Sequence, residues 1–132
     1  MKSLNYLVFI VFTLAITVIS CNKNDSTTSA ESEMLTSKSW KLISVIMNGT
    51  EYLKDCNKDD ITTYSADGTF LINVGSITCS GESNQSGTWS LQYAETIIVI
   101  SLNNTVVSCY IEITENKLIL GYSNIISIYV PA

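Results

Sequence analysis

The sequence contains no histidine and no arginine, and only 14% of its 132 residues are charged. Without histidine, the general bases, catalytic triads and zinc sites that depend on an imidazole are unavailable. Seven lysines face twelve acidic residues, so the clustered positive charge that nucleic-acid binding requires is missing as well. No pair of carboxylates stands at a recognisable catalytic spacing, and the serines lack a base. We therefore predict neither an enzyme nor a nucleic-acid-binding protein.

Proline and helical periodicity are also scarce. Pro131 is the single proline, and no segment after residue 34 keeps a 3.6-residue apolar period. Instead, apolar and polar residues alternate between turn-forming pairs such as Asn48-Gly49 and Asn103-Asn104, which is typical of β-strands joined by hairpins. Eight strands are expected, near 39–47, 60–65, 69–75, 87–92, 96–102, 105–114, 117–122 and 125–130.

The longest apolar run lies at the amino terminus, from Leu4 to Ile19 after a basic Met1-Lys2 start. Sixteen residues in a helix span about 24 Å, less than the hydrocarbon core of a bilayer, which is about 30 Å thick. This length is typical of a secretory signal peptide, which we predict to cover residues 1–20.

The residues that follow the apolar run suggest a lipid anchor. Val18-Ile19-Ser20-Cys21 resembles a bacterial lipobox, and the resemblance implies cleavage before Cys21 and lipidation of its sulfur. Residues 21–34 are then a lipidated cysteine followed by a flexible polar tether. The expected location is the outer membrane of a cell envelope, on either its periplasmic or its surface face. Asp25-Ser26-Thr27 is similar to an O-glycosylation motif of Bacteroidota, but a simple solvated spacer is the favoured interpretation.

Hairpin register can be deduced from the turns. Two-residue turns at 103–104 and 115–116 pair Ile98 with Cys109 and Ile111 with Leu120. Both hairpins then agree on one inner face, made by Ile98, Ile100, Val107, Cys109, Ile111, Ile113, Leu118, Leu120 and Tyr122. The last hairpin joins this face only through a three-residue turn that pairs Leu120 with Ile128.

A two-residue turn at Asp67-Gly68 pairs Ile61 with Val74 and also sets Cys56 opposite Cys79. We therefore predict a Cys56–Cys79 disulfide, which an exported location permits. Cys109 remains as a thiol on the inner face.

Eight sequential antiparallel strands favour an all-β, up-and-down barrel over residues 35–132, because closure removes exposed edges; a two-sheet β-sandwich is the alternative. Several short motifs occur in order: Leu35-Thr36-Ser37-Lys38-Ser39-Trp40-Lys41-Leu42, Asp55-Cys56-x-x-Asp59-Asp60-Ile61, Tyr64-x-x-Asp67-Gly68-Thr69-Phe70, Cys79 and Gly87-Thr88-Trp89-x-Leu91. This order resembles the small lipocalin-like lipoproteins of Bacteroidota. The resemblance implies a lipocalin-like barrel, export as a lipoprotein and the Cys56–Cys79 bridge.

Two functions fit these features. The first is binding of a small, mostly apolar molecule in a cavity, for which a neutral ligand suits a cation-free interior better than an anion. The candidate lining residues are Trp40, Phe70, Trp89, Ile98, Ile100 and Tyr122. The alternative is an interaction or inhibitor module with a filled core, presenting outward aromatics such as Tyr64, Tyr93 and Tyr110 together with the loops at 49–59 and 76–86.

No cofactor and no metal are expected. Asp55-x-Asn57-x-Asp59 imitates the start of a calcium loop, but Asp60 and Ala66 stand where that loop requires glycine and glutamate.

Overall fold

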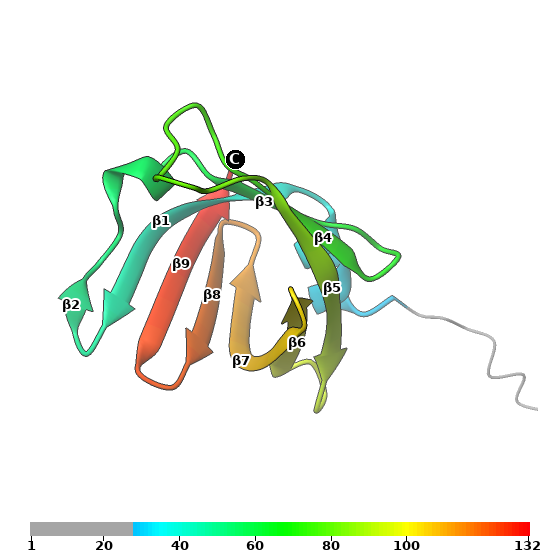
Figure 1. Cartoon of the computed structure of the whole chain (residues 1–132). Helices are drawn as coiled ribbons and strands as arrows, with labels where there is room; N and C mark the ends of the chain where they lie inside the picture. Colours follow the sequence, from blue (N-terminus) through cyan, green and yellow to red (C-terminus); the bar gives the residue numbers. More distant parts are fainter. Residues whose placement is uncertain (1–27) are drawn as a thin grey trace, which may run out of the picture.

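The computed structural model describes residues 28–132, in which one short helix precedes nine strands (Figure 1). The elements are α1 (Ala30–Thr36), β1 (Ser39–Met47), β2 (Thr50–Glu51), the single 3₁₀ turn η1 (Asp55–Asn57), β3 (Ile61–Tyr64), β4 (Thr69–Asn73), β5 (Gln85–Gln92), β6 (Ile97–Leu102), β7 (Thr105–Thr114), β8 (Lys117–Tyr122) and β9 (Ile125–Pro131). The signal peptide, Cys21, the glycosylation-like motif and most of the tether lie outside the described residues.

The sheet closes on itself. β1 and β3 to β9 each pair antiparallel with their neighbours, and β9 returns to β1 from the Trp40–Pro131 pair to the Met47–Ile125 pair. Figure 1 shows β9 lying between β1 and β8, while the two-residue β2 only extends β1. The predicted eight-stranded barrel is confirmed, and the β-sandwich alternative is wrong because one continuous ring of strands leaves no second sheet.

The middle hairpins have the predicted register. Ile98 pairs with Cys109 across β6 and β7, and Ile111 pairs with Leu120 across β7 and β8. Asn103 and Asn104 adopt φ of 49° and 64°, the left-handed conformation that a tight two-residue turn demands and asparagine tolerates. The turn residues and the apolar alternation therefore specify the same inner face.

The last hairpin differs from its prediction. A two-residue turn at Ser123-Asn124, with Ser123 at φ 53°, pairs Leu120 with Ser127 and not with Ile128. Directly opposed residues share a face of the sheet, so Ser127 and Tyr129 turn inward with Leu120. The prediction failed because β9 carries apolar residues on both faces, and such a strand does not reveal its register by hydrophobicity alone.

The β3–β4 hairpin is displaced by one residue from its prediction. Its loop has three residues, since the Ser65 N–H donates to the Thr69 carbonyl (2.8 Å) and Gly68 takes φ +84°. Ile61 consequently pairs with Asn73, while Tyr64 pairs with Phe70 and is 3% exposed. The expectation that Tyr64 is an outward aromatic is therefore wrong.

Cys56 and Cys79 are nevertheless joined by a disulfide, with Cα atoms 5.1 Å apart. The bridge links η1 to the loop after β4. Asp59 and Asp60 hold the same two segments together: Asp59 Oδ2 accepts a hydrogen bond from Ile77 N (3.0 Å), and Asp60 Oδ1 accepts one from Gly75 N (3.4 Å). Asp59, one of the residues that imitate a calcium loop, thus binds a backbone amide.

Helix α1 corrects the predicted tether, which we expected to extend to residue 34. Ser29 Oγ accepts a hydrogen bond from Ser32 N (3.1 Å) and caps the helix, and Leu35 is fully buried against the barrel. A seven-residue helix is not stable on its own. Its polar composition therefore predicts a flexible spacer, and only the packing of Leu35 against the barrel stabilises the helix. None of the helices within residues 28–132 has the length and apolar character needed to cross a membrane.

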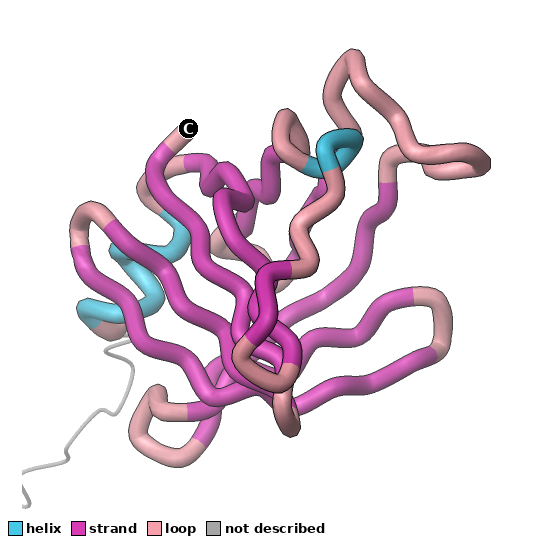
Figure 2. The backbone as a smooth tube through the Cα atoms, turned by 90° about the vertical axis from the view of Figure 1, so that its left-hand side faces the viewer, coloured by secondary structure: helices cyan, strands magenta, loops and turns pink. Residues whose placement is uncertain are grey.

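The two ends of the barrel differ. Helix α1 covers one end, where Lys38 Nζ donates to the Glu115 carbonyl in the β7–β8 turn (2.8 Å). Figure 2 shows η1 and the long loops on the side opposite α1. The β6–β7 and β8–β9 turns lie at that second end, because strands alternate in direction around the ring.

Candidate functional site

The barrel interior is filled near α1 by large side chains. Trp40 and Ile98 are fully buried, and Tyr64 meets Trp89 edge to face with ring centroids 5.9 Å apart. Phe70 packs on Gly87, the residue opposite it on β5, where any side chain would overlap the Phe70 ring and the Ser101 carbonyl. This half of the barrel is a packed core.

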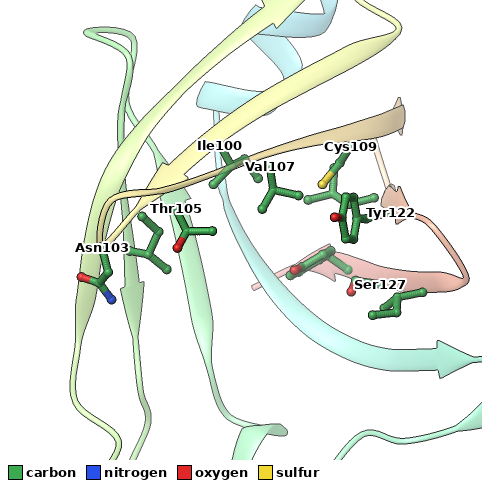
Figure 3. Close-up of a pocket in the computed structure, with 11 residues that line it drawn as sticks. Ile100, Asn103, Thr105, Val107, Cys109, Tyr122 and Ser127 are labelled. Atoms are coloured by element: carbon green, nitrogen blue, oxygen red, sulfur yellow. The ribbon is translucent and has the colours of Figure 1, made fainter.

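The other half contains a cavity of about 410 Å³ between β6, β7, β8 and β9. Figure 3 shows the side chains of Val107, Cys109, Tyr122 and Ser127 gathered around this space. Its walls are formed by Ile100, Leu102, Asn103, Thr105, Val107, Cys109, Leu120, Tyr122, Ile125, Ser127 and Tyr129. Every second residue of these strands faces inward, so the alternation of the sequence builds the wall.

The six candidate lining residues divide between these two regions. Ile100 and Tyr122 line the cavity. Trp40, Phe70, Trp89 and Ile98 belong to the packed core. The binding-pocket and filled-core interpretations therefore each describe one half of the same barrel.

Sequence reasoning missed the polar residues of the wall. Asn103 and Thr105 lie at the mouth, in and beside the β6–β7 turn, while Ser127 and Tyr129 lie deeper on β9. The two-residue turn at Ser123-Asn124 places Ser127 and Tyr129 inside, whereas a wholly apolar inner face favours the three-residue turn that pairs Leu120 with Ile128.

The wall is electrically neutral. None of the eleven lining residues is a lysine, aspartate or glutamate. Burial raises the pKa of the Cys109 thiol, and burial raises the pKa of Tyr129 to about 12, with the neighbouring Ser127 hydroxyl partly offsetting this shift. Burial also holds the pKa of Tyr64 well above its usual range, with smaller contributions from Tyr129 and Cys109. All three groups are protonated at neutral pH.

Alkaline pH should therefore destabilise the fold through Tyr129. The pKa of Tyr129 is higher in the folded state than the usual value of 10. The stability that neutral Tyr129 contributes to the fold is therefore complete below pH 10 and is lost as the pH rises toward about 12. Between pH 9 and about pH 11.5 we expect Tyr129 to lower the free energy of unfolding by about 2 kcal/mol. Urea unfolding at both pH values should show a smaller loss for Tyr129→Phe, while the exposed Tyr93→Phe serves as the control. Equal losses in both variants would contradict this assignment.

No group of three or more acidic or cysteine side chains within residues 28–132 is arranged to hold a metal ion. The cavity is an apolar space whose wall also carries hydroxyl, thiol and amide groups. It opens at the end of the barrel opposite α1.

Comparisons with known proteins agree with this architecture. The family model described as a lipocalin-like domain matches residues 35–120. A lipocalin-like protein from Bacteroides uniformis ATCC 8492 is 18% identical with a TM-score of 0.59, covering 75% of this chain and 99% of that one. A DUF4847 family protein from Bacteroides vulgatus ATCC 8482 is 14% identical with a TM-score of 0.57, covering 74% of this chain and 94% of its own.

An uncharacterized protein from Bacteroides eggerthii DSM 20697 is 16% identical, with a TM-score of 0.57, and covers 72% of this chain and 98% of its own. No curated protein matches the sequence. At these identities the solved structures support the fold alone, whereas the family model spans most of the barrel. Together with the closed ring of eight strands, that match shows that the chain belongs to the lipocalin-like domain family.

Proposed function

We propose that this protein binds a small, mostly apolar molecule in the cavity between β6 and β9. The observation that carries the proposal is the contrast between the two halves of the barrel. The α1 half is packed with aromatic rings, while the other half contains a cavity of about 410 Å³ lined mostly by apolar side chains. Ligand sites in proteins are typically of this size, mostly apolar and supplied with a few polar groups.

The position of the cavity suits an anchored binding protein. The described chain begins at α1, and the cavity opens at the end opposite that helix. We propose that lipidated Cys21 anchors the protein in the outer membrane of the cell envelope, so that the tether holds the closed end toward the lipid. The mouth would then face away from the anchor, accessible to a ligand in the surrounding space.

The test uses residues 22–132, which contain the complete barrel and its core, and the neutral fluorescent probe N-phenylnaphthylamine. Val107→Trp places an indole inside the cavity, and we expect the variant to bind the probe at least about tenfold more weakly, a difference of about 1.4 kcal/mol. The matched control is Val106→Trp, one residue earlier on β7, because Val106 is 65% exposed on the outer face. Fluorescence titration that finds no binding, or equal binding in both variants, would overturn the proposal.

A contact surface for another protein is the second candidate function. On the outer face, Tyr110 of β7 lies over Gly121 of β8, and Gly121 pairs with Ile126 of β9. Tyr110 and Ile126 are each about half exposed, so the barrel presents an apolar row to solvent. Crosslinking on intact cells should capture a partner through Tyr110 if this surface is used, and Tyr110→Ser should abolish the capture.

A further inference from the structure

Within residues 28–132, every charged side chain lies outside the cavity wall, which restricts the ligands that the cavity can accept. None of the lysines within residues 28–132 lines the cavity. Lys41, Lys54, Lys58 and Lys117 are exposed, and Lys38 lies over the Trp40 ring at the α1 end, with its Nζ 5.7 Å from the ring centroid. A carboxylate drawn into the cavity would therefore lose its water without meeting a cation. Burial of an unpaired charge is strongly unfavourable, so an ionised ligand is disfavoured.

The inner end of the cavity offers hydrogen-bond donors instead. Ser127 and Tyr129 stand two residues apart on β9 and so share its inner face. Ser127 pairs with the inward Leu120, and Tyr129 pairs with the fully buried Leu118, which places the tyrosine deeper. Because Tyr129 keeps its proton at neutral pH, its hydroxyl can donate to an oxygen of a ligand.

The volume limits the size of that ligand. At the packing density of protein interiors, about 0.74, a cavity of about 410 Å³ holds about 300 Å³ of ligand, or about 15 non-hydrogen atoms. The aliphatic walls formed by residues such as Ile100, Val107 and Leu120 suit a hydrocarbon body.

We infer that the cavity selects uncharged ligands of about 15 non-hydrogen atoms that carry a carbonyl or hydroxyl oxygen at the inner end, where the Ser127 and Tyr129 hydroxyls bind it. Ionised fatty acids with the same number of non-hydrogen atoms are excluded. This inference rests on the proposed function and adds the class of ligand. The neutral wall excludes charged ligands, and the hydroxyls of Ser127 and Tyr129 bind the ligand oxygen.

The test displaces N-phenylnaphthylamine from residues 22–132 with three molecules of matched chain length: dodecanol, a methyl ketone and dodecanoate. Near neutral pH we expect the alcohol and the ketone to bind at least about tenfold more tightly than the carboxylate. The affinity for dodecanoate should rise as the pH falls toward the pKa of its carboxyl group, since the neutral acid fits the wall. Equal or tighter binding of dodecanoate at neutral pH would overturn the inference.

Tyr129→Phe separates recognition of the oxygen from general apolar binding. Relative to its affinity for the probe, the variant should lose about fivefold in affinity for the alcohol and the ketone. Tyr93→Phe, far more exposed, should change neither affinity. Suppose that the probe binds and that Val107→Trp weakens its binding. If Tyr129→Phe then leaves the affinities for the alcohol and the ketone unchanged relative to the probe, the inferred ligand class is wrong and the proposed function stands. If no probe binds to the unmodified protein, the proposed function fails with it.

Discussion

Replacing Trp40 with alanine is expected to lower the free energy of unfolding by about 4 kcal/mol, close to the largest loss that a single core truncation causes. Trp40 is fully buried at the start of β1, and its indole N–H donates to the Leu35 carbonyl at 3.0 Å. The alanine variant would leave a cavity and an unpaired carbonyl at the end of α1. Urea unfolding followed by circular dichroism measures the loss.

Trp40→Phe divides this effect into two parts. Phenylalanine retains most of the apolar ring but cannot donate to Leu35, so we expect a loss of about 1 to 2 kcal/mol. In both variants the fluorescence of the remaining Trp89 should report whether the core is intact. A loss below about 1.5 kcal/mol for Trp40→Ala would show that this ring does not hold the α1 end together.

Removing the disulfide with Cys56→Ser and Cys79→Ser together is expected to cost about 3 kcal/mol, because the bridge closes a loop of about 24 residues and restricts the unfolded chain. The barrel strands do not depend on the bridge directly, and the bonds of Asp59 and Asp60 to the loop after β4 remain. We therefore expect the double variant to fold, with faster amide exchange confined to the loops around η1 and residues 74–84.

Reductant provides the matched control for this prediction. Dithiothreitol should destabilise the unmodified protein to the level of the double serine variant and leave that variant unaffected. Cys109, which is buried on the inner face and not bonded, is present in both proteins and cancels in the comparison. Equal stability of oxidised and reduced protein would contradict a structural role for the bridge.

The disulfide also shows how a correct prediction can rest on an incorrect step. The sequence-based register of the β3–β4 hairpin was one residue out, since Gly68 completes a three-residue loop. The cysteines lie beyond the paired strands, where an error of one residue changes the approach of two loops little. The same slip did matter at Tyr64, because within a strand one residue exchanges the inner face for the outer face.

The cavity was only partly predictable for a related reason. Alternation along β6, β7 and β8 correctly turns Ile100, Val107 and Leu120 inward. Whether inward side chains fill a barrel or leave it hollow depends on their volumes across the whole ring, and four candidate lining residues proved to be core. The proposed ligand class depends on the inward positions of Ser127 and Tyr129. These positions follow only from the pairing of β9 with β8.

The chain alone specifies the all-β class, the approximate positions of the eight barrel strands, the inner face of the middle hairpins and the cysteines that pair. These features follow from local signals: turn residues that accept positive φ, alternation with a period of two, and the scarcity of helical periodicity. Long-range packing sets the docking of α1, the register of β9 and the division of the interior into a packed half and a hollow half. Each of these depends on contacts between segments distant in the chain, whose energies are set by how side chains fit together and not by the order of residues along one strand.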